Sequence, residues 1–429
     1  MKKVIKNGLV ITMDEKRVKL YEHLDIVIEN DTIVDILDNY KGEYDEIIDA
    51  TGKIVMPGLI NCHTHLGMSI FRATNDNLGL DDWLNKKIWP IENNMTDDDV
   101  YYSVILSILE MLESGTTCSN DMYFSSLRSI DAIKETKVRS VFSRCLMDND
   151  DKGDDRIKEF RKLYEENKNN DLITFAVAPH SLYTCSKEYL KKCSDLALEL
   201  KLPIHIHFCE NQNEVKNIKK IYGNALKALQ KTNLIKNKLI LAHGTFINNK
   251  ELKGLKNKDI SICHNPISNL NLGCGIADIV KYKNYVNVCL GTDGQGSGNN
   301  MNLFYHMSVV DLLQKGNYKD STITSSYDTL KMATINGAKA LGLEDKIGSI
   351  EIGKKADIII IDTNYFNTYP NVDTITNIVH NIESTNVETV MINGEVLINN
   401  HKLTLNINKD VLKEKVNEMI ERLMKRSDI

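Results

Sequence analysis

The feature that most constrains the fold is an alternation of short β-rich runs with helical patterns between residues 56 and 346. Helical stretches such as DDDVYYSVILSILEMLESG (97–115) separate eight candidate strands. These strands are KIVMPGLINCHTHL, TTCSNDM, RSVFSRCLMD, LITFAVAPH, LPIHIHFCE, KLILAHGT, DISICHNPIS and VNVCLGTDG. Strands that alternate with helices form βαβ units and a parallel sheet. Eight units over about 290 residues predict an α/β fold, a (β/α)8 TIM barrel, with its active site at the carboxyl ends of the strands.

The two ends of the chain have a different, extended character. Residues 1–55 contain short runs such as VIKNGLVITM and LDIVIEN, separated by Asn, Asp and Gly turn signals. The same pattern returns after residue 346 in IGSIEIGKKADIIIID and VETVMINGEVLIN. We therefore expect residues 1–55 and 347–407 to form one small β-sandwich domain. Residues 56–346 should form the barrel, and residues 408–429 a charged C-terminal helix.

Composition narrows the classes of partner. Of the 429 residues, 42% are hydrophobic and 26% are charged, and the formal net charge is -6, which argues against a nucleic-acid or anionic membrane partner. The nine cysteines are dispersed without a CxxC pair, which is typical of reduced thiols. No segment reaches the roughly 18 consecutive apolar residues of a membrane span, and the N-terminal stretch lacks a secretory signal pattern. We expect a cytoplasmic homo-oligomer with no nucleic-acid or membrane partner.

Histidines gather at the ends of the predicted strands. Asp293, in LGTDGQGSGNN, ends the eighth strand. Seven of the eleven histidines lie at such ends, namely His63, His65, His180, His205, His207, His243 and His264. Residues i and i+2 of a strand share a face, so His63 and His65 can both point into the barrel, although packed core imidazoles would show the same spacing. We assign His205 and His264 to supporting hydrogen bonds or to packing.

His63, His65, His207 and Asp293 together form a candidate set of metal ligands. A barrel brings the ends of their strands to one mouth. Three neutral imidazoles and a carboxylate can bind a divalent ion such as Zn²⁺ and leave room for water. A buried aspartate is rare without a partner, which favours a metal over packing. Because ITFAVAPHSLYTC offers no lysine before Lys187 that could bridge two ions, we expect one divalent metal per chain, Zn²⁺ in preference to Fe²⁺.

Further residues could move protons beside such a metal. A metal lowers the pKa of its bound water, and hydrolysis then needs a proton shuttle. Glu210, three residues after His207 in HFCE, can supply it. His243 in LAHGT could hold or polarise the hydroxide, and Asp293 could both bind the metal and take a proton. Taken singly, Glu210 could instead form a loop salt bridge, and His243 could be a core histidine.

Ordered motifs along the chain resemble the amidohydrolase superfamily. The motifs are PGLINCHTHLGMSIFR, HFCE, LAHG, NPISNLNLGCGIA, GTDG and IGSIEIGKKADIIIID. The likeness covers nearly the whole chain, including the terminal β domain. Within the superfamily the chain is similar to the aromatic deaminase and chlorohydrolase branch, and most of all to the 5-methylthioadenosine/S-adenosylhomocysteine deaminase group.

The resemblance implies roles for particular residues. It implies the metal ligands already named, with Glu210 as the proton shuttle and His243 beside the metal-bound water. The nucleoside-binding positions of the group match Glu92 in WPIENN, Arg144 in FSRCLMD, Arg156 in DDRIKE and His180 in APHS, with Glu210 and Asp293 also facing the substrate.

These matches make chemical sense, and each has a structural alternative. A glutamate can accept both ribose hydroxyls, while arginines suit the carboxylate of a homocysteine tail. Glu92 could instead cap or pair on a helix, and Arg144 and Arg156 could form surface salt bridges. Trp83 and Trp89 could wall the pocket or simply pack.

The activity implied by the resemblance is hydrolytic deamination of an adenine nucleoside or thio-nucleoside, such as 5-methylthioadenosine, S-adenosylhomocysteine or adenosine. Alternatives are a deaminase of guanine, 8-oxoguanine or another heterocycle, and a triazine chlorohydrolase, although base-only enzymes would have little use for Glu92 and the arginines. A non-catalytic scaffold would be expected to lose metal ligands that this chain keeps. The loop after Asp293 reads GQGSGNN where relatives have a less glycine-rich AASNN type, which leaves its rigidity and its effect on substrate choice open.

Overall fold

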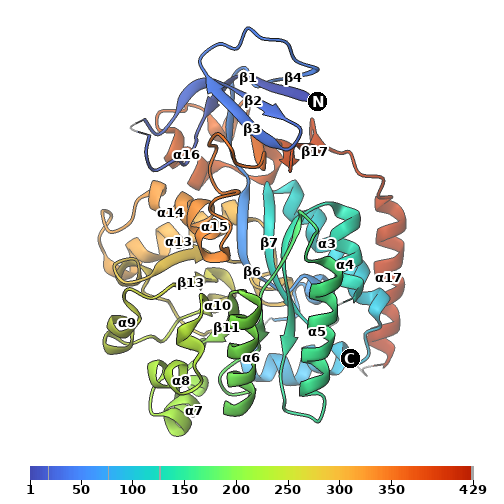
Figure 1. Cartoon of the computed structure of the whole chain (residues 1–429), viewed down its shortest axis with the longest axis vertical. Coiled ribbons are helices and arrows are strands. Elements are labelled where there is room, and N and C mark those ends of the chain that lie inside the picture. The colour runs from blue at the N-terminus through green and yellow to red at the C-terminus, as the bar shows by residue number, and fades with distance from the viewer. Residues whose placement is uncertain (18, 76, 125–126, 427–429) are drawn as a thin grey trace.

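Strands occur in all eight places where the sequence predicts them, and together they form a barrel (Figure 1). The structure is a computed structural model that describes residues 1–17, 19–75, 77–124 and 127–426. The barrel strands are β6 (Leu59–Thr64), β7 (Thr116–Tyr123), β8 (Arg139–Leu146), β9 (Ile173–Phe175), β10 (Ala178–Pro179), β11 (Ile204–Phe208), β12 (Leu239–His243), β13 (Ile260–His264) and β14 (Asn287–Leu290). Two predicted strands are divided: LITFAVAPH into β9 and β10, and KIVMPGLINCHTHL into β6 and a preceding strand, β5 (Lys53–Pro57), which belongs to the terminal sheet.

Neighbouring barrel strands pair in parallel, and the ring closes at both of its seams. Strands β6 to β10 form one arc, and β11 to β14 form the other. The arcs meet at a parallel bridge between Val177 and Ile204. At the opposite seam, the Asp293 N–H donates to the His63 carbonyl oxygen at 3.0 Å. The predicted (β/α)8 barrel is therefore confirmed, with strands that are buried on both faces as parallel strands usually are.

Helices follow the barrel strands along the chain. They are α3 (Asp97–Glu113), α4 (Leu127–Thr136), α5 (Gly153–Asn167), α6 (Lys187–Leu200), α7 (Gln212–Tyr222), α8 (Ala225–Lys231), α9 (Asn249–Leu255), α10 (Pro266–Asn271), α11 (Ile279–Tyr282), α12 (Gln295–Gly298), α13 (Leu303–Tyr318), α14 (Ser326–Met332) and α15 (Ile335–Leu341). Side-chain caps fix several of their starts. Thr96 and Asp99 form a capping box on α3, and the Ser186 hydroxyl accepts the Tyr189 N–H at the start of α6.

Strands from both chain ends share one nine-stranded sheet, at the top of Figure 1. They are β1 (Lys2–Val10), β2 (Glu22–Glu29), β3 (Thr32–Leu37), β4 (Glu46–Asp49), β5 (Lys53–Pro57), β15 (Ile358–Asp362), β16 (Val387–Ile392), β17 (Glu395–Asn399) and β18 (Lys402–Leu403). Strand β5 pairs in parallel with β1 and antiparallel with β15, so it joins the two ends. Helix α16 (Thr374–Asn381) lies between β15 and β16 along the chain. We propose residues 1–55 with 347–407 as one domain and residues 56–346 as the other.

A C-terminal helix, α17 (Lys409–Arg426), runs beside α3 (Figure 1). Its buried side chains are Leu412, Val416, Met419 and Leu423, which recur at helical spacing and form a single apolar stripe. Arg422 donates to Asp99 of α3. Within the described ranges, no helix is both long enough and apolar enough to cross a membrane.

A buried ion pair ties the barrel to the terminal sheet. Arg139, at the start of β8, donates to both carboxylate oxygens of Asp357 at 2.6 and 2.9 Å, and both side chains are 2% exposed. Asp357 also accepts the Asn393 N–H at 2.8 Å. The pair therefore holds the entry of a barrel strand against the residue that precedes β15.

We expect Asp357→Ala to destabilise the protein strongly. The substitution leaves the Arg139 guanidinium buried without its charge partner, and breaking a buried pair in this way costs about 3–5 kcal/mol. Thermal unfolding followed by circular dichroism measures the effect. The control is Lys192→Ala, which breaks an exposed pair with Asp154 and should change stability by about 1 kcal/mol or less. Equal shifts in the two variants would contradict a structural role for Asp357.

Candidate active site

Three strand ends bring the four predicted metal ligands together at one mouth of the barrel. His63 lies in β6 and His65 follows that strand directly. His207 lies in β11, and Asp293 follows β14. The Asp293 Oδ1 lies 3.1 Å from His65 Nε2 and 3.4 Å from His63 Nε2. His207 Nε2 lies 3.2 Å from His65 Nε2. Each of the four residues therefore directs one ligand atom at the same small region.

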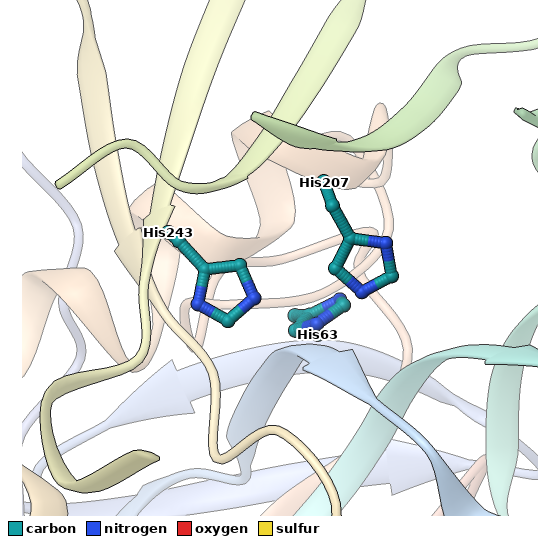
Figure 2. Close-up of side chains that lie close together, drawn as sticks. All are labelled: His63, His207 and His243. Atoms are coloured by element: carbon teal, nitrogen blue, oxygen red, sulfur yellow. The ribbon is translucent and has the colours of Figure 1, made fainter. Parts of the chain in front are cut away.

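Two overlapping sets of side chains in this region could hold a cation. The ligand atoms of His63, His65 and Asp293 all lie within 4.8 Å of one another, and so do those of His63, His207 and His243, whose rings face one another in Figure 2. Among the described residues, His63 Nε2 and His243 Nε2 are buried without a hydrogen-bond partner. Such nitrogens are unfavourable in a protein interior unless they are satisfied. This set of nitrogen and oxygen donors therefore fits a divalent metal such as zinc.

Backbone carbonyls determine which nitrogen of two of these rings faces the site. His65 Nδ1 lies 2.6 Å from the Met122 carbonyl oxygen, and His207 Nδ1 lies 2.8 Å from that of His180. A carbonyl oxygen only accepts, so Nδ1 is the protonated nitrogen in both rings. In the neutral form of each ring, Nε2 then keeps its lone pair toward the site, which is the tautomer that a metal ligand requires.

His205, which the sequence assigns to supporting hydrogen bonds or to packing, contacts the predicted metal ligand His63. Its Nε2 lies 2.8 Å from His63 Nδ1, and the two ring centroids are 4.9 Å apart. One ring must donate to the other, so His205 can hold the orientation of His63. His264 is fully buried at the end of β13, and its carbonyl oxygen accepts the Gly291 N–H at 3.0 Å.

Two serine hydroxyls hold the oxygen of Asp293 that faces away from the imidazoles. Ser268 and Ser297 donate to Asp293 Oδ2 at 2.6 and 2.8 Å. Ser297 belongs to the glycine-rich loop, and its carbonyl oxygen accepts from Asn75 and Asn271 at 2.9 and 2.8 Å. Hydrogen bonds therefore hold the loop to two other segments. Because both serine hydroxyls bind Oδ2, Oδ1 is the Asp293 oxygen that is directed at the histidines.

Glu210 lies just past the end of β11, where the chain turns into α7. Its side chain is 8% exposed, and burial raises the pKa of the carboxyl above its ordinary value. Cys209 before it has a left-handed backbone with φ of +52°. The carboxylate of Glu214, one turn into α7, accepts the Glu210 N–H at 2.7 Å. This contact fixes the main chain from which the Glu210 side chain projects.

His243 faces Glu210 across the site. Its Nδ1 lies 3.8 Å from Glu210 Oε1 and 2.8 Å from Asn269 Oδ1. Because the amide oxygen only accepts, Nδ1 carries the proton and Nε2 keeps its lone pair. His243 thus has a fixed orientation, and its ring lies beside those of His63 and His207 (Figure 2).

A pocket opens from this region and is walled mostly by apolar side chains. The segment after β6 supplies much of the wall and comprises η1 (Leu66–Phe71), α1 (Leu80–Trp83), η2 (Leu84–Ile88) and α2 (Trp89–Glu92). The apolar lining residues are Met68, Leu80, Trp83, Leu84, Ile88, Trp89, Met122, Phe124 and Leu272. Trp83 is both packed and lining, with its indole N–H donated to Thr74 at 3.2 Å, whereas Trp89 is 40% exposed. His65, His207, Glu210 and Asp293 lie in the same lining.

Two of the four predicted nucleoside-binding residues line this pocket. Glu92 accepts the Tyr123 hydroxyl at 2.6 Å, and burial raises the pKa of its carboxyl to about 7. His180 lines the pocket with its ring 4.8 Å from that of His207. The His180 Nδ1 lies 2.8 Å from the Thr184 hydroxyl oxygen.

The two predicted arginines lie outside the residues that line the pocket. Arg144 donates to Glu159 at 3.1 Å and to the Cys145 carbonyl oxygen at 2.9 Å. Arg156 donates to both oxygens of Asp150 at 2.5 and 2.7 Å. The salt bridges that the sequence left as an alternative are therefore present, and binding of a substrate carboxylate by these arginines stays a prediction.

Comparison with known proteins places the chain in a family. Residues 54–397 match the Amidohydrolase family. The chain belongs to the amidohydrolase family. It is 39% identical to the 5-methylthioadenosine/S-adenosylhomocysteine deaminase of Thermoanaerobacter pseudethanolicus, over 99% of both chains, and 37% identical to the 5'-deoxyadenosine deaminase of Methanobrevibacter smithii, over 99% of this chain and 98% of that one. A zinc-bound crystal structure of an adenosine deaminase from Xanthomonas campestris superposes with a TM-score of 0.94 at 28% identity, over 99% of this chain and 98% of that one.

Sequence reasoning missed the polar groups that support the site of this amidohydrolase. Ser268, Ser297 and Tyr123 each donate a hydroxyl to a carboxylate of a predicted site residue. Hydroxyl residues are common, and the partners of Ser268 and Tyr123 lie 25 and 31 residues away in the sequence. Glu214 left a local signal, because an N-cap asparagine, Asn211, precedes it by three residues in the pattern of a capping box.

Proposed function

We propose that this amidohydrolase removes the 6-amino group of an adenine nucleoside or thio-nucleoside by hydrolysis, with an inosine-type product and ammonia. The observation that carries the proposal is a single pocket lined by three of the four candidate ligands, His65, His207 and Asp293, together with Glu210 and, elsewhere in its wall, Glu92. A metal held by the candidate ligands can, with Glu210, support hydrolysis of a C–N bond, and the Glu92 carboxylate can accept ribose hydroxyls. Relatives that match nearly the full length are named for deamination of such nucleosides, which supports the same substrate class.

Deaminases of this family depend on a metal, and His63, His65, His207 and Asp293 would hold it here. When bound, a divalent ion supplies Lewis-acid activation of water near neutral pH. Imidazole and carboxylate donors suit Zn²⁺, with Fe²⁺ as the alternative. We propose one ion per chain, because the β9–β10 segment presents no lysine that could bridge a pair.

The remaining roles concern protons. Burial raises the pKa of Glu210, which favours the protonated carboxyl that can deliver a proton to a ring nitrogen of the adenine as C6 is attacked. His243 lies beside Glu210 with its Nε2 lone pair directed into the site, and so can accept a hydrogen bond from the attacking water. Asp293 has Oδ2 occupied by two serines, so any proton that it passes to the departing ammonia must pass through Oδ1.

An ammonia-release screen with purified protein tests the substrate class. The panel is adenosine, 5'-deoxyadenosine, 5-methylthioadenosine, S-adenosylhomocysteine, guanine, 8-oxoguanine and a chlorinated triazine, and the Glu210→Gln protein is the background control. We expect ammonia from the adenine nucleosides. Faster turnover of guanine or 8-oxoguanine, or chloride release from the triazine, would replace the proposal with the corresponding alternative, and no turnover at all would favour a scaffold. The homo-oligomeric state and the cytoplasmic location also stay predictions.

The predicted role of the arginines gives a separate test. If Arg144 or Arg156 meets the homocysteine carboxylate, its replacement by alanine should reduce kcat/KM for S-adenosylhomocysteine about 10- to 100-fold more than for 5-methylthioadenosine, which lacks a carboxylate. Arg156 would first have to exchange Asp150 for the substrate. Glu92→Ala should weaken both substrates.

The matched control is Arg161→Ala. Arg161 lies on the same helix as Arg156 and makes a similar two-point contact with Glu199 at the surface. It should leave the ratio of the two substrates unchanged. Equal losses for both substrates in the Arg144 and Arg156 variants would remove the arginines from carboxylate recognition.

A further inference from the structure

Tyr123 lies where it can control the carboxylate that faces the nucleoside. It ends β7, its side chain is 3% exposed, and its hydroxyl donates to Glu92 Oε1 at 2.6 Å. Both residues line the pocket that also contains His65 and Asp293. Because Oε1 is taken by Tyr123, Oε2 is the oxygen of Glu92 that can meet a ligand.

The position of the Tyr123 ring is tightly constrained. A Cβ atom built on Gly67 would lie 2.1 Å from ring atom Cε1, so the ring rests against backbone that only glycine leaves bare. On another side, the ring of Phe124 lies 5.7 Å away between centroids. The hydroxyl therefore has a fixed position, and its hydrogen bond holds the Glu92 carboxylate in place.

Glu92 needs such a partner because of where it lies in the chain. It is the last residue of α2, a four-residue helix that directly follows the π-helical turn η2. A segment of this kind offers its side chains little support from regular secondary structure. The hydroxyl donor on the rigid β7 strand supplies that support, and it also favours the ionised carboxylate against the effect of burial.

We propose that Tyr123 is a positioning residue that sets specificity for nucleosides with a ribose diol, by holding Glu92 so that Oε2 accepts the 2'- and 3'-hydroxyls. This inference rests on the proposed function, in which Glu92 binds the ribose. It extends that function because it assigns recognition of the diol to a pair of residues on two different elements.

The experiment compares adenosine with 2',3'-dideoxyadenosine in the wild type and in Tyr123→Phe, which keeps the ring and removes only the hydroxyl. For adenosine, we expect kcat/KM to fall about tenfold, mostly through KM, which is near the lower end for a hydrogen bond to a charged group. For the dideoxy compound, kcat/KM should stay within about twofold. Glu92→Gln should show the same selectivity, and the double variant should be no worse than Glu92→Gln alone.

Controls separate this role from a general structural one. Tyr318→Phe removes a hydroxyl that also donates to a carboxylate, Asp278, away from the pocket lining, and it should change neither substrate. Metal content and thermal melting are measured for every variant. Equal losses for the two nucleosides in Tyr123→Phe, or no loss for adenosine, would overturn the inference. If the wild type instead releases no ammonia from any adenine nucleoside, the proposed function itself fails, which is a distinct result.

Discussion

His63→Ala and Asp293→Asn are each expected to abolish deamination and to lose the bound metal. His63 contributes a buried Nε2 without a hydrogen-bond partner among the described residues, and Asp293 Oδ1 lies within 3.4 Å of two imidazoles. Removing either one deletes a ligand from a set of four. Elemental analysis of the isolated proteins should give close to one Zn²⁺ or Fe²⁺ per wild-type chain and far less in both variants.

The control for the metal experiment is His264→Asn. His264 is also a fully buried histidine at a strand end, but it belongs to neither group of candidate ligand atoms. The His264→Asn protein should retain its metal. This result would show that the loss of metal in His63→Ala is not a general effect of replacing a buried histidine. Two ions per wild-type chain, or full activity after thorough chelation, would contradict the single-metal proposal.

Glu210→Gln should keep its fold and its metal but lose about 10²- to 10⁴-fold in kcat, the usual contribution of a general acid-base group. The amide has nearly the same size and its oxygen can still accept a hydrogen bond, yet it cannot carry the proton. Steady-state kinetics and metal analysis on one preparation make the comparison. Near-normal kcat would remove Glu210 from proton transfer.

Glu251→Gln is the matched control for Glu210→Gln. Glu251 is a buried glutamate, 7% exposed, that forms a capping box with Asn248 on α9 and does not line the pocket. Its replacement removes a buried carboxylate of the same size without touching the site. A comparable loss of kcat in Glu251→Gln would mean that the effect at Glu210 reports structural damage.

The barrel and the metal site could be predicted because both depend on local patterns. Apolar runs between helical segments give the strands, and the spacing of His63 and His65 on one strand puts both side chains on the same face. The order of strand ends around a barrel then follows from chain order. The bridge at Val177 and the split of this segment into β9 and β10 could not be predicted from LITFAVAPH, because its apolar run from Phe175 to Pro179 shows no interruption.

Long and hydroxylated side chains were harder to place than the histidines. Arg144 pairs with Glu159 and Arg156 with Asp150, and which acidic partner each arginine takes depends on three-dimensional distances that the sequence does not give. Tyr123 and Glu92 are 31 residues apart and meet only because α2 lies over the end of β7. No periodicity in the sequence records such a contact.

The shared sheet of the two chain ends has a consequence for synthesis on the ribosome. Strand β5 emerges early, but its five-residue antiparallel partner β15 begins only at Ile358, about 300 residues later. At a translation rate of about 5–20 residues per second, the β5 edge waits for about 15–60 seconds with only two residue pairs to β1. An unpaired apolar edge of this kind invites strand addition by other chains. Nascent chains stalled before residue 358 should therefore depend on chaperones far more than the completed protein does.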